Sequence, residues 1–203
     1  MVKEMRKAIC LLLLAIAAFA AAPVPRKAPE FVIHMPDGKQ LLLSSYRGKT
    51  VVLALMFTTC THCQHTAPIL SDIQKDYANK GVQVLGATFD EQASTQVSQF
   101  DKLFAKGFPC GYSTNQEVLR FLQQPESDGP YVPILVFIDK TGVIRAVHMV
   151  TGSIANGDTP KGREEQDFFA KPEVTIRAEL DKVLKGEKTS TSTASAAPKG
   201  PRS

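Results

Sequence analysis

The chain has 203 residues, which is enough for one domain with a full hydrophobic core but too few for two complete ones. Its composition, with 43% hydrophobic and 22% charged residues, is that of an ordinary globular protein and excludes a disordered or fibrous one. The formal net charge is +4, but no basic stripe interleaved with aromatic residues accompanies it, so we expect no nucleic-acid binding.

Residues 1–22 have the pattern of a secretory signal peptide. A short basic segment precedes the uncharged apolar run from Ala8 to Ala22, and Ala18-Phe19-Ala20 fits an A-x-A cleavage site. A retained membrane anchor is the alternative, but the run is shorter than the roughly 20 residues that a spanning helix needs. We therefore expect export to a bacterial periplasm, with loss of Cys10 on cleavage and with membrane contact only if the segment is retained.

The remaining chain divides into three parts. Residues 23–28 are rich in proline and are expected to form an extended lead-in. Residues 29–184 carry the periodic apolar segments and are expected to form the domain. Residues 185–203 are too polar and too small to build a core, so we expect a disordered tail.

The first segments of the domain predict strands and then a helix. Residues 31–49 have short apolar stretches on either side of Asp37-Gly38, a turn dipeptide, and predict a strand pair. The continuous apolar run from Thr50 to Phe57 is typical of a central strand buried on both faces. A helical period then runs from Thr61 to Lys80, and Gly81 ends it as a C-cap residue.

The second half alternates in the same way. Val82 to Asp90 predicts another buried strand, residues 108–113 ("FPCGYS") form a connecting segment, and residues 133–150 predict an antiparallel hairpin. Three more helices are predicted from apolar positions at helical spacing: Val97, Phe100, Leu103 and Phe104; Val118, Leu119 and Leu122; and Val174, Ile176, Leu180 and Val183. Strands that alternate with helices and end in a hairpin and a helix predict an α/β sandwich with a mixed sheet.

Cys60 and Cys63 stand directly after the predicted central strand, at the start of the predicted helix. A sulfur at a helix N-terminus faces unpaired backbone N–H groups and the positive end of the helix dipole, and both favour the thiolate. Cys60 is therefore the predicted nucleophile, and Cys63, one turn further in, is the predicted resolving thiol of a redox-active disulfide. His62 is expected to favour the thiolate further, which would make the disulfide more oxidising.

A CxxC between a buried strand and a helix, with Pro68 in that helix, resembles the thioredoxin superfamily. The segment "YVPILVFIDKTGVIRAVHMVTGS" (131–153) adds to the resemblance, because Val132-Pro133 is similar to the superfamily's cis-proline loop and is followed by a hairpin and Gly152. The stretch between the Pro68 helix and the hairpin includes a strand and a helix that minimal thioredoxins lack. That insertion resembles the TlpA/ResA-like, AhpC/TSA-related branch.

This resemblance implies a three-layer α/β/α sandwich and an exported thiol–disulfide oxidoreductase that exchanges disulfides with protein substrates. It also implies that the backbone at Val132 and Pro133, with a cis bond between them, lies against the CxxC and pairs with the substrate chain. It implies no bound cofactor and no metal, but it requires a redox partner that resets the dithiol. We expect the protein to be a monomer.

The sequence departs from this branch in three ways. Thr58-Thr59 stand where the branch has a tryptophan before the first cysteine. Thr66 stands where the branch often has a glutamate, and the buried aspartate of thioredoxin corresponds to Ala54. We therefore expect His62, His65 or water to accept the proton of the resolving cysteine, and the direction of exchange stays open.

Two other functions remain open. A peroxiredoxin-like thiol peroxidase is favoured by the inserted elements, but Phe57 replaces the threonine expected three residues before its reactive cysteine. A Sco-like copper-binding protein would share the fold, but it needs CxxxC spacing and a distant histidine, for which His148 is the candidate. We interpret His148 and His34 as ordinary strand residues and Cys110 as a buried thiol, with a third redox thiol as the alternative for Cys110.

Overall fold

The computed structural model describes residues 23–124, 131–150 and 160–186. Its strands are β1 (Arg26–Lys27), β2 (Val32–His34), β3 (Gln40–Leu42), β4 (Thr50–Met56), β5 (Val82–Thr88), β6 (Cys110–Tyr112), β7 (Tyr131–Ile138) and β8 (Val143–Val150). Its α-helices are α2 (Thr61–Tyr77), α3 (Ala93–Phe104), α4 (Asn115–Leu122), α6 (Pro160–Ala170) and α7 (Pro172–Lys185), and its short 3-10 helices are η2 (Leu43–Tyr46) and η3 (Ala78–Lys80).

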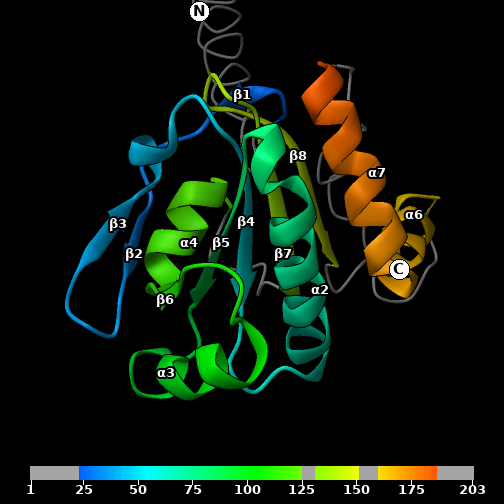
Figure 1. Cartoon of the computed structure of the whole chain (residues 1–203). Helices are drawn as coiled ribbons and strands as arrows, with labels where there is room; N and C mark the ends of the chain where they lie inside the picture. Colours follow the sequence, from blue (N-terminus) through cyan, green and yellow to red (C-terminus); the bar gives the residue numbers. More distant parts are fainter. Residues whose placement is uncertain (1–22, 125–130, 151–159, 187–203) are drawn as a thin grey trace, which may run out of the picture.

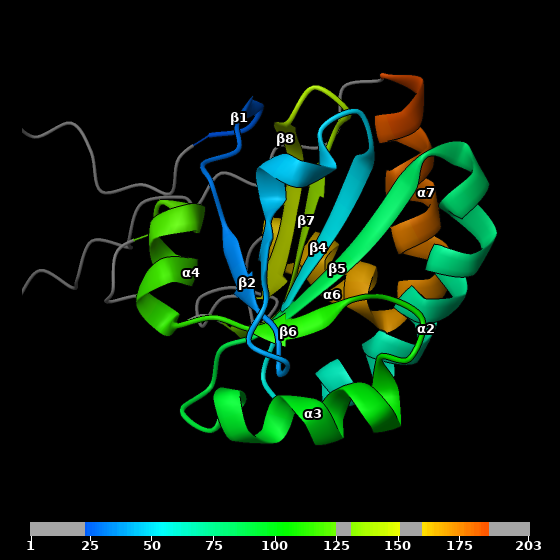
Figure 2. The same cartoon turned by 60° about the vertical axis from the view of Figure 1, so that its left-hand side comes forward.

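These strands form one mixed sheet in the order β1-β8-β7-β4-β5-β6-β2-β3, in which β4, β5 and β6 are parallel. Helix α4 covers one face of the sheet, while α2, α6 and α7 cover the other, and α3 lies at the end of the sheet where α2 begins (Figure 1, Figure 2). The predicted three-layer α/β/α sandwich with a mixed sheet is confirmed.

Strand β4 lies in the middle of the sheet. It pairs in parallel with β5, from Thr50 opposite Val82 to Met56 opposite Thr88, and antiparallel with β7 on its other side. Every residue of β4 is buried. This explains the continuous apolar run, because a strand covered on both faces has no solvent side that would need polar residues.

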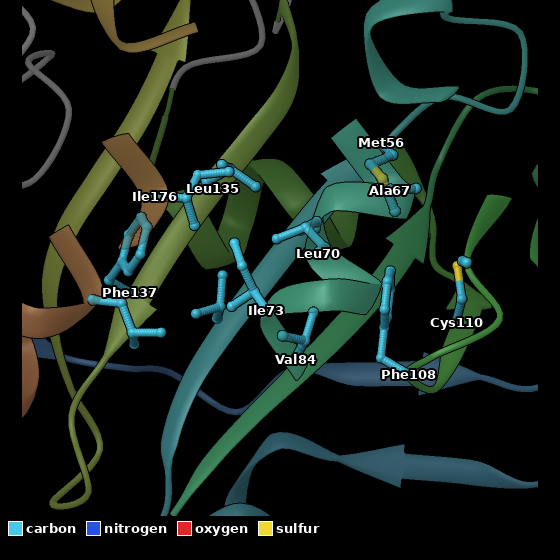
Figure 3. Close-up of a cluster of buried hydrophobic side chains, with 14 of the residues drawn as sticks. Met56, Ala67, Leu70, Ile73, Val84, Phe108, Cys110, Leu135, Phe137 and Ile176 are labelled. Carbon is cyan, nitrogen blue, oxygen red and sulfur yellow. The ribbon is translucent and has the colours of Figure 1, made fainter. Parts of the chain in front are cut away.

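Two apolar clusters, one on each face of the sheet, hold the layers together. Figure 3 shows the cluster beneath α2, where Leu70 and Ile73 lie with Leu135 and Phe137 of β7, all four fully buried. On the opposite face α4 contributes Phe121 to the second cluster. Burying a side chain of this kind contributes about 1.5–3 kcal/mol to the free energy of folding.

Two of the apolar residues that predicted helices are exposed. Val174 on α7 is 65% exposed, because it lies two residues before the buried Ile176 and therefore on the other side of the helix. Leu103 on α3 is 58% exposed, although Val97 and Phe100 of the same helix are buried.

The structure adds three elements to the predicted set. Residues 110–112 of the connecting segment form β6, which extends the parallel sheet from β5. Helix α6 was not predicted. The lead-in contributes β1, in which Arg26 pairs with Ile144 of β8, and Val24 before it is buried.

The predicted signal peptide (1–22), Gly152 and the tail beyond Gly186 lie outside the described residues. Gly186 itself ends α7 with a positive φ of 71°, the conformation that favours glycine at this place. Within the described ranges, no helix is both long and apolar enough to cross a membrane.

Candidate active site

The dithiol lies where β4 ends and α2 begins (Figure 1). Cys60 is the N-cap residue of α2, with extended backbone angles (φ −78°, ψ 117°). Its sulfur accepts a hydrogen bond from the backbone N–H of Cys63 at 3.2 Å. The sulfur thus takes the capping place that a serine or aspartate oxygen usually fills, and it satisfies one of the free N–H groups of the first turn.

This position activates Cys60. The pKa of Cys60 is lowered from 9.0 to about 6, chiefly by the hydrogen bond with the Cys63 side chain. Partial burial opposes the shift, while the backbone N–H groups of Cys63 and His62 and the charge of His62 support it. A thiol with a pKa of about 6 is about 90% thiolate at pH 7.

Cys63 has the opposite environment. It is fully buried, and both burial and its hydrogen bond to Cys60 raise the pKa of its thiol far above the ordinary value. Both cysteines are free thiols in this structure. The pair therefore consists of a partly exposed thiolate and a shielded, protonated neighbour within hydrogen-bond reach of it.

The Val132-Pro133 segment lies against the dithiol. The carbonyl oxygen of Val132 is 3.5 Å from Cys60 Sγ, within the distance at which a thiol donates a hydrogen bond to it. The peptide bond between Val132 and Pro133 is cis, and Pro133 is buried at the start of β7. Cys60 and Val132, which are 72 positions apart in the sequence, are thus neighbours in the fold.

The histidines next to the cysteines are exposed. His62 acts on Cys60 through its charge and its backbone N–H, whereas His65 makes no hydrogen bond that the structure shows to either cysteine. Thr66 and Ala54, the two positions at which the sequence lacks the acidic residues of similar proteins, are both buried.

The residue that sequence reasoning missed is Asp90, which follows β5. Its carboxylate accepts hydrogen bonds from both the backbone N–H and the hydroxyl of Thr58, each at 2.7 Å. The side chain of Gln64 on α2 donates to the carbonyl of Thr58 at 3.0 Å. Asp90 and Gln64 together fix the turn that presents Cys60, and the negative charge of Asp90 is one of the causes that raise the pKa of Cys63.

One signal in the sequence could have pointed to Asp90. A polar residue directly after a buried parallel strand lies at the carboxyl edge of the sheet, where sites of α/β proteins gather. Asp90 ends the predicted strand from Val82, and Thr58 follows the parallel strand beside it. The two are therefore brought together by strand pairing.

The remaining candidates lie apart from the dithiol. His148 is buried on β8, where its Nδ1 is 3.3 Å from a carboxylate oxygen of Glu165 and its ring stacks on Phe168 at 3.8 Å. His34 stacks on the ring of Tyr112 at 5.4 Å. Among the described residues no three histidine, cysteine or acidic side chains gather as metal ligands would.

Cys110 lies on β6, 1% exposed, and burial raises the pKa of its thiol well above the ordinary value. Figure 3 shows its side chain near Phe108, at the edge of the apolar cluster beneath α2. A protonated and buried thiol is a poor nucleophile, which agrees with the interpretation of Cys110 as a packing residue.

Comparisons with known proteins identify the family of this chain. The model of the AhpC/TSA family matches residues 24–147. The chain is 29% identical over 164 residues to the thiol-disulfide oxidoreductase ResA of Geobacillus thermodenitrificans, covering 76% of this chain and 90% of the relative. It is 28% identical over 127 residues to ResA of Bacillus subtilis, covering 63% of this chain and 66% of the relative.

Solved structures show the same fold. A thiol:disulfide interchange protein of the thioredoxin family from Chlorobium tepidum superposes with a TM-score of 0.56 at 21% identity, covering 79% of this chain and 97% of the other. A putative thiol:disulfide interchange protein DsbE from the same species gives a TM-score of 0.54 at 20% identity, covering 74% and 96%. At these identities the likeness concerns the fold alone.

Proposed function

The chain belongs to the AhpC/TSA family, and from this premise we propose that it is an exported thiol–disulfide oxidoreductase acting through Cys60 and Cys63. The observation that carries the proposal is the difference between the two thiols. Cys60 is partly exposed with its pKa lowered to about 6, and Cys63 is fully buried with its pKa raised. A redox-active dithiol needs this asymmetry, because one sulfur must attack the substrate disulfide as a thiolate while the other stays protonated until the mixed disulfide has formed.

The exchange proceeds in two steps. The Cys60 thiolate attacks one sulfur of a substrate disulfide, which forms a mixed disulfide and expels the other substrate sulfur as a thiolate. Cys63 then releases its proton to solvent and attacks Cys60 Sγ, which forms the Cys60–Cys63 disulfide and releases the second substrate sulfur as a thiolate. Two electrons pass from the protein to the substrate, and the same steps in reverse oxidise a substrate dithiol.

The substrates in this proposal are protein disulfides or thiols. Val132 and Pro133 form the substrate-contact segment, since Val132 O already lies 3.5 Å from the attacking sulfur. An extended substrate chain would pair with this backbone in the manner of an added strand. A second thiol or disulfide protein must restore the starting form, because the exchange consumes the dithiol or the disulfide.

Export completes the proposal. The pattern of residues 1–22 supports a cleaved signal peptide and a periplasmic site of action, where disulfides persist. A retained anchor at the same segment is the alternative. Comparing the mass of the mature protein with that of the full chain distinguishes the two.

Trapping tests the function. In a Cys63→Ser variant the mixed disulfide cannot be resolved, so we expect substrate proteins to accumulate covalently on Cys60 and to be released by dithiothreitol. The matched control is the double variant Cys60→Ser with Cys63→Ser, which should trap nothing. If the single variant, expressed in its native compartment, traps no more protein than the double variant, the proposal is wrong.

The alternative functions have less support. Phe57 occupies the place of the peroxidase threonine, and the hydroxyl of Thr58, next to Phe57, is held by the Asp90 carboxylate. Consumption of hydrogen peroxide that requires Cys60 but not Cys63 would favour the peroxidase. Copper bound in equimolar amount by the reduced protein, and lost in Cys60→Ser, would favour the copper carrier.

A further inference from the structure

A groove lies between α3 and the two threonines that precede Cys60. Thr58, Thr59 and Gln64 line one wall, and α3 lines the other with Gln96, Gln99 and Leu103 over two phenylalanines of the same helix. Its volume is about 250 Å³, which is enough for one or two side chains. Figure 1 shows α3 next to the first turn of α2, so the groove begins at the residue that precedes Cys60.

The lining of this groove is uncharged. Its residues are threonines, glutamines, phenylalanines and one leucine, so they offer hydroxyl and amide groups together with apolar surface. An ionised side chain entering it would lose hydration without meeting an opposite charge, which is costly. Charge complementarity therefore favours a neutral occupant.

Two exposed apolar side chains belong to the segments that lie beside Cys60. Among the described residues, the large apolar side chains with substantial exposure are Leu42, Leu103, Tyr131 and Val174. Leu103, 58% exposed, lines the groove with Thr59, and Tyr131, 49% exposed, precedes Val132, whose carbonyl oxygen is 3.5 Å from Cys60 Sγ.

We propose that the groove between α2 and α3 binds a neutral side chain, aliphatic or amide, that lies within a few residues of the cysteine in the substrate polypeptide. This inference rests on the proposed function and adds a substrate class to it. Thr59, which lines the groove, directly precedes Cys60, so a chain whose cysteine reacts with Cys60 can place a neighbouring side chain in the groove. Leu103 and Gln99 are the specificity-determining residues.

A set of peptide disulfides tests the proposal. Each peptide carries one cysteine as a mixed disulfide with glutathione, and the three positions on each side of it are scanned with leucine, glutamine, lysine or glutamate. The measured quantity is the second-order rate constant for reduction by the fully reduced protein. At one or two positions we expect leucine and glutamine to give rates about tenfold above those of lysine and glutamate, which corresponds to about 1.4 kcal/mol.

Variants assign this preference to the groove. In Gln99→Glu the ratio of the leucine rate to the lysine rate should fall at least about fivefold, because the new carboxylate attracts lysine. In Leu103→Ser the same ratio should fall about threefold. The matched controls are Gln123→Glu, the same charge change at the end of α4 on the opposite face of the sheet, and Leu42→Ser on β3; both should keep the wild-type ratio.

The outcomes separate this inference from the proposed function. Equal rates for all peptides, or a preference unchanged in Gln99→Glu and Leu103→Ser, would contradict the proposed role of the groove. Neither result would contradict the proposed oxidoreductase function. No reduction of any peptide, with thiols that still react with a small disulfide, would contradict the function itself. A preference that appears only on dilution would assign the groove to a second copy of this chain and overturn the proposal.

Discussion

Reaction of the reduced protein with the small disulfide 2,2′-dithiodipyridine will measure how strongly the fold activates Cys60. At pH 5 a thiol with a pKa of about 6 is about 9% thiolate, whereas one with the ordinary pKa of 9.0 is about 0.01% thiolate. The thiolate fractions thus differ about 900-fold. The difference in rate is about 15- to 30-fold smaller than this, because a less basic thiolate is also a weaker nucleophile. We therefore expect Cys60 to react about 30 to 60 times faster than an unperturbed thiol at pH 5.

At pH 7 the same calculation gives an advantage of only about three- to sixfold, so the measurement must extend into acid. The assay follows the release of pyridine-2-thione from pH 4 to 9, with a short unstructured cysteine peptide as the reference and Cys60→Ser as the control. The rate should rise with pH to a plateau with a midpoint near 6. In Cys63→Ala the midpoint should move upward, since the hydrogen bond that contributes most to the shift is lost. A midpoint of 8 or above in the wild-type protein would refute the reasoning.

Three further results are expected. The unfolding temperature of the reduced protein should rise between about pH 6 and 8.5 relative to that of the disulfide form. Because folding lowers the pKa of Cys60, the unfolded state binds more protons in this range, and stability therefore increases with pH. Unfolding temperatures that change in parallel for the two forms would contradict this. Leu70→Ala should lower the free energy of unfolding in urea by about 2–5 kcal/mol, against less than about 0.5 kcal/mol for the exposed control Val174→Ala. Asp90→Asn keeps an acceptor for Thr58 but removes a negative charge that disfavours the Cys63 thiolate. The attack of Cys63 on the mixed disulfide, which releases the second pyridine-2-thione, should therefore accelerate roughly threefold. A slower release would mean that Asp90 accepts the proton of Cys63.

The elements around the site were predictable because their signals are local. The run from Thr50 to Phe57 is almost wholly apolar, and the helix after Cys60 has regular apolar spacing. Helix α2 ends at Tyr77, earlier than the predicted Lys80, and the 3-10 helix η3 continues it to Lys80, where Gly81 ends the turn with a φ of 77°. Each of these properties depends on residues close together in the sequence. The place of Cys60 at the helix N-terminus follows from them directly.

The missed elements depend on distant contacts. Strand β6 has three residues, which is too short for a periodic pattern, and it becomes a strand because β5 offers a free edge. Helix α6 has few apolar residues, and Phe168 is buried by packing on His148. Thr58 and Asp90 are 32 positions apart, and parallel strand pairing brings them into contact. Sequence reasoning identified the sulfurs but not the carboxylate that fixes the turn before them.

The position of β1 determines which way the dithiol faces relative to the N-terminus. Arg26 pairs with Ile144, which lies opposite Ile138, and Ile138 in turn lies opposite Val51 near the start of β4. Cys60 follows the other end of that strand, which is seven residues or about 20 Å long. If the segment before residue 23 held the protein on a membrane, the end of the sheet with β1 would be nearest the lipid, and the dithiol at the opposite end would be within reach of soluble partners.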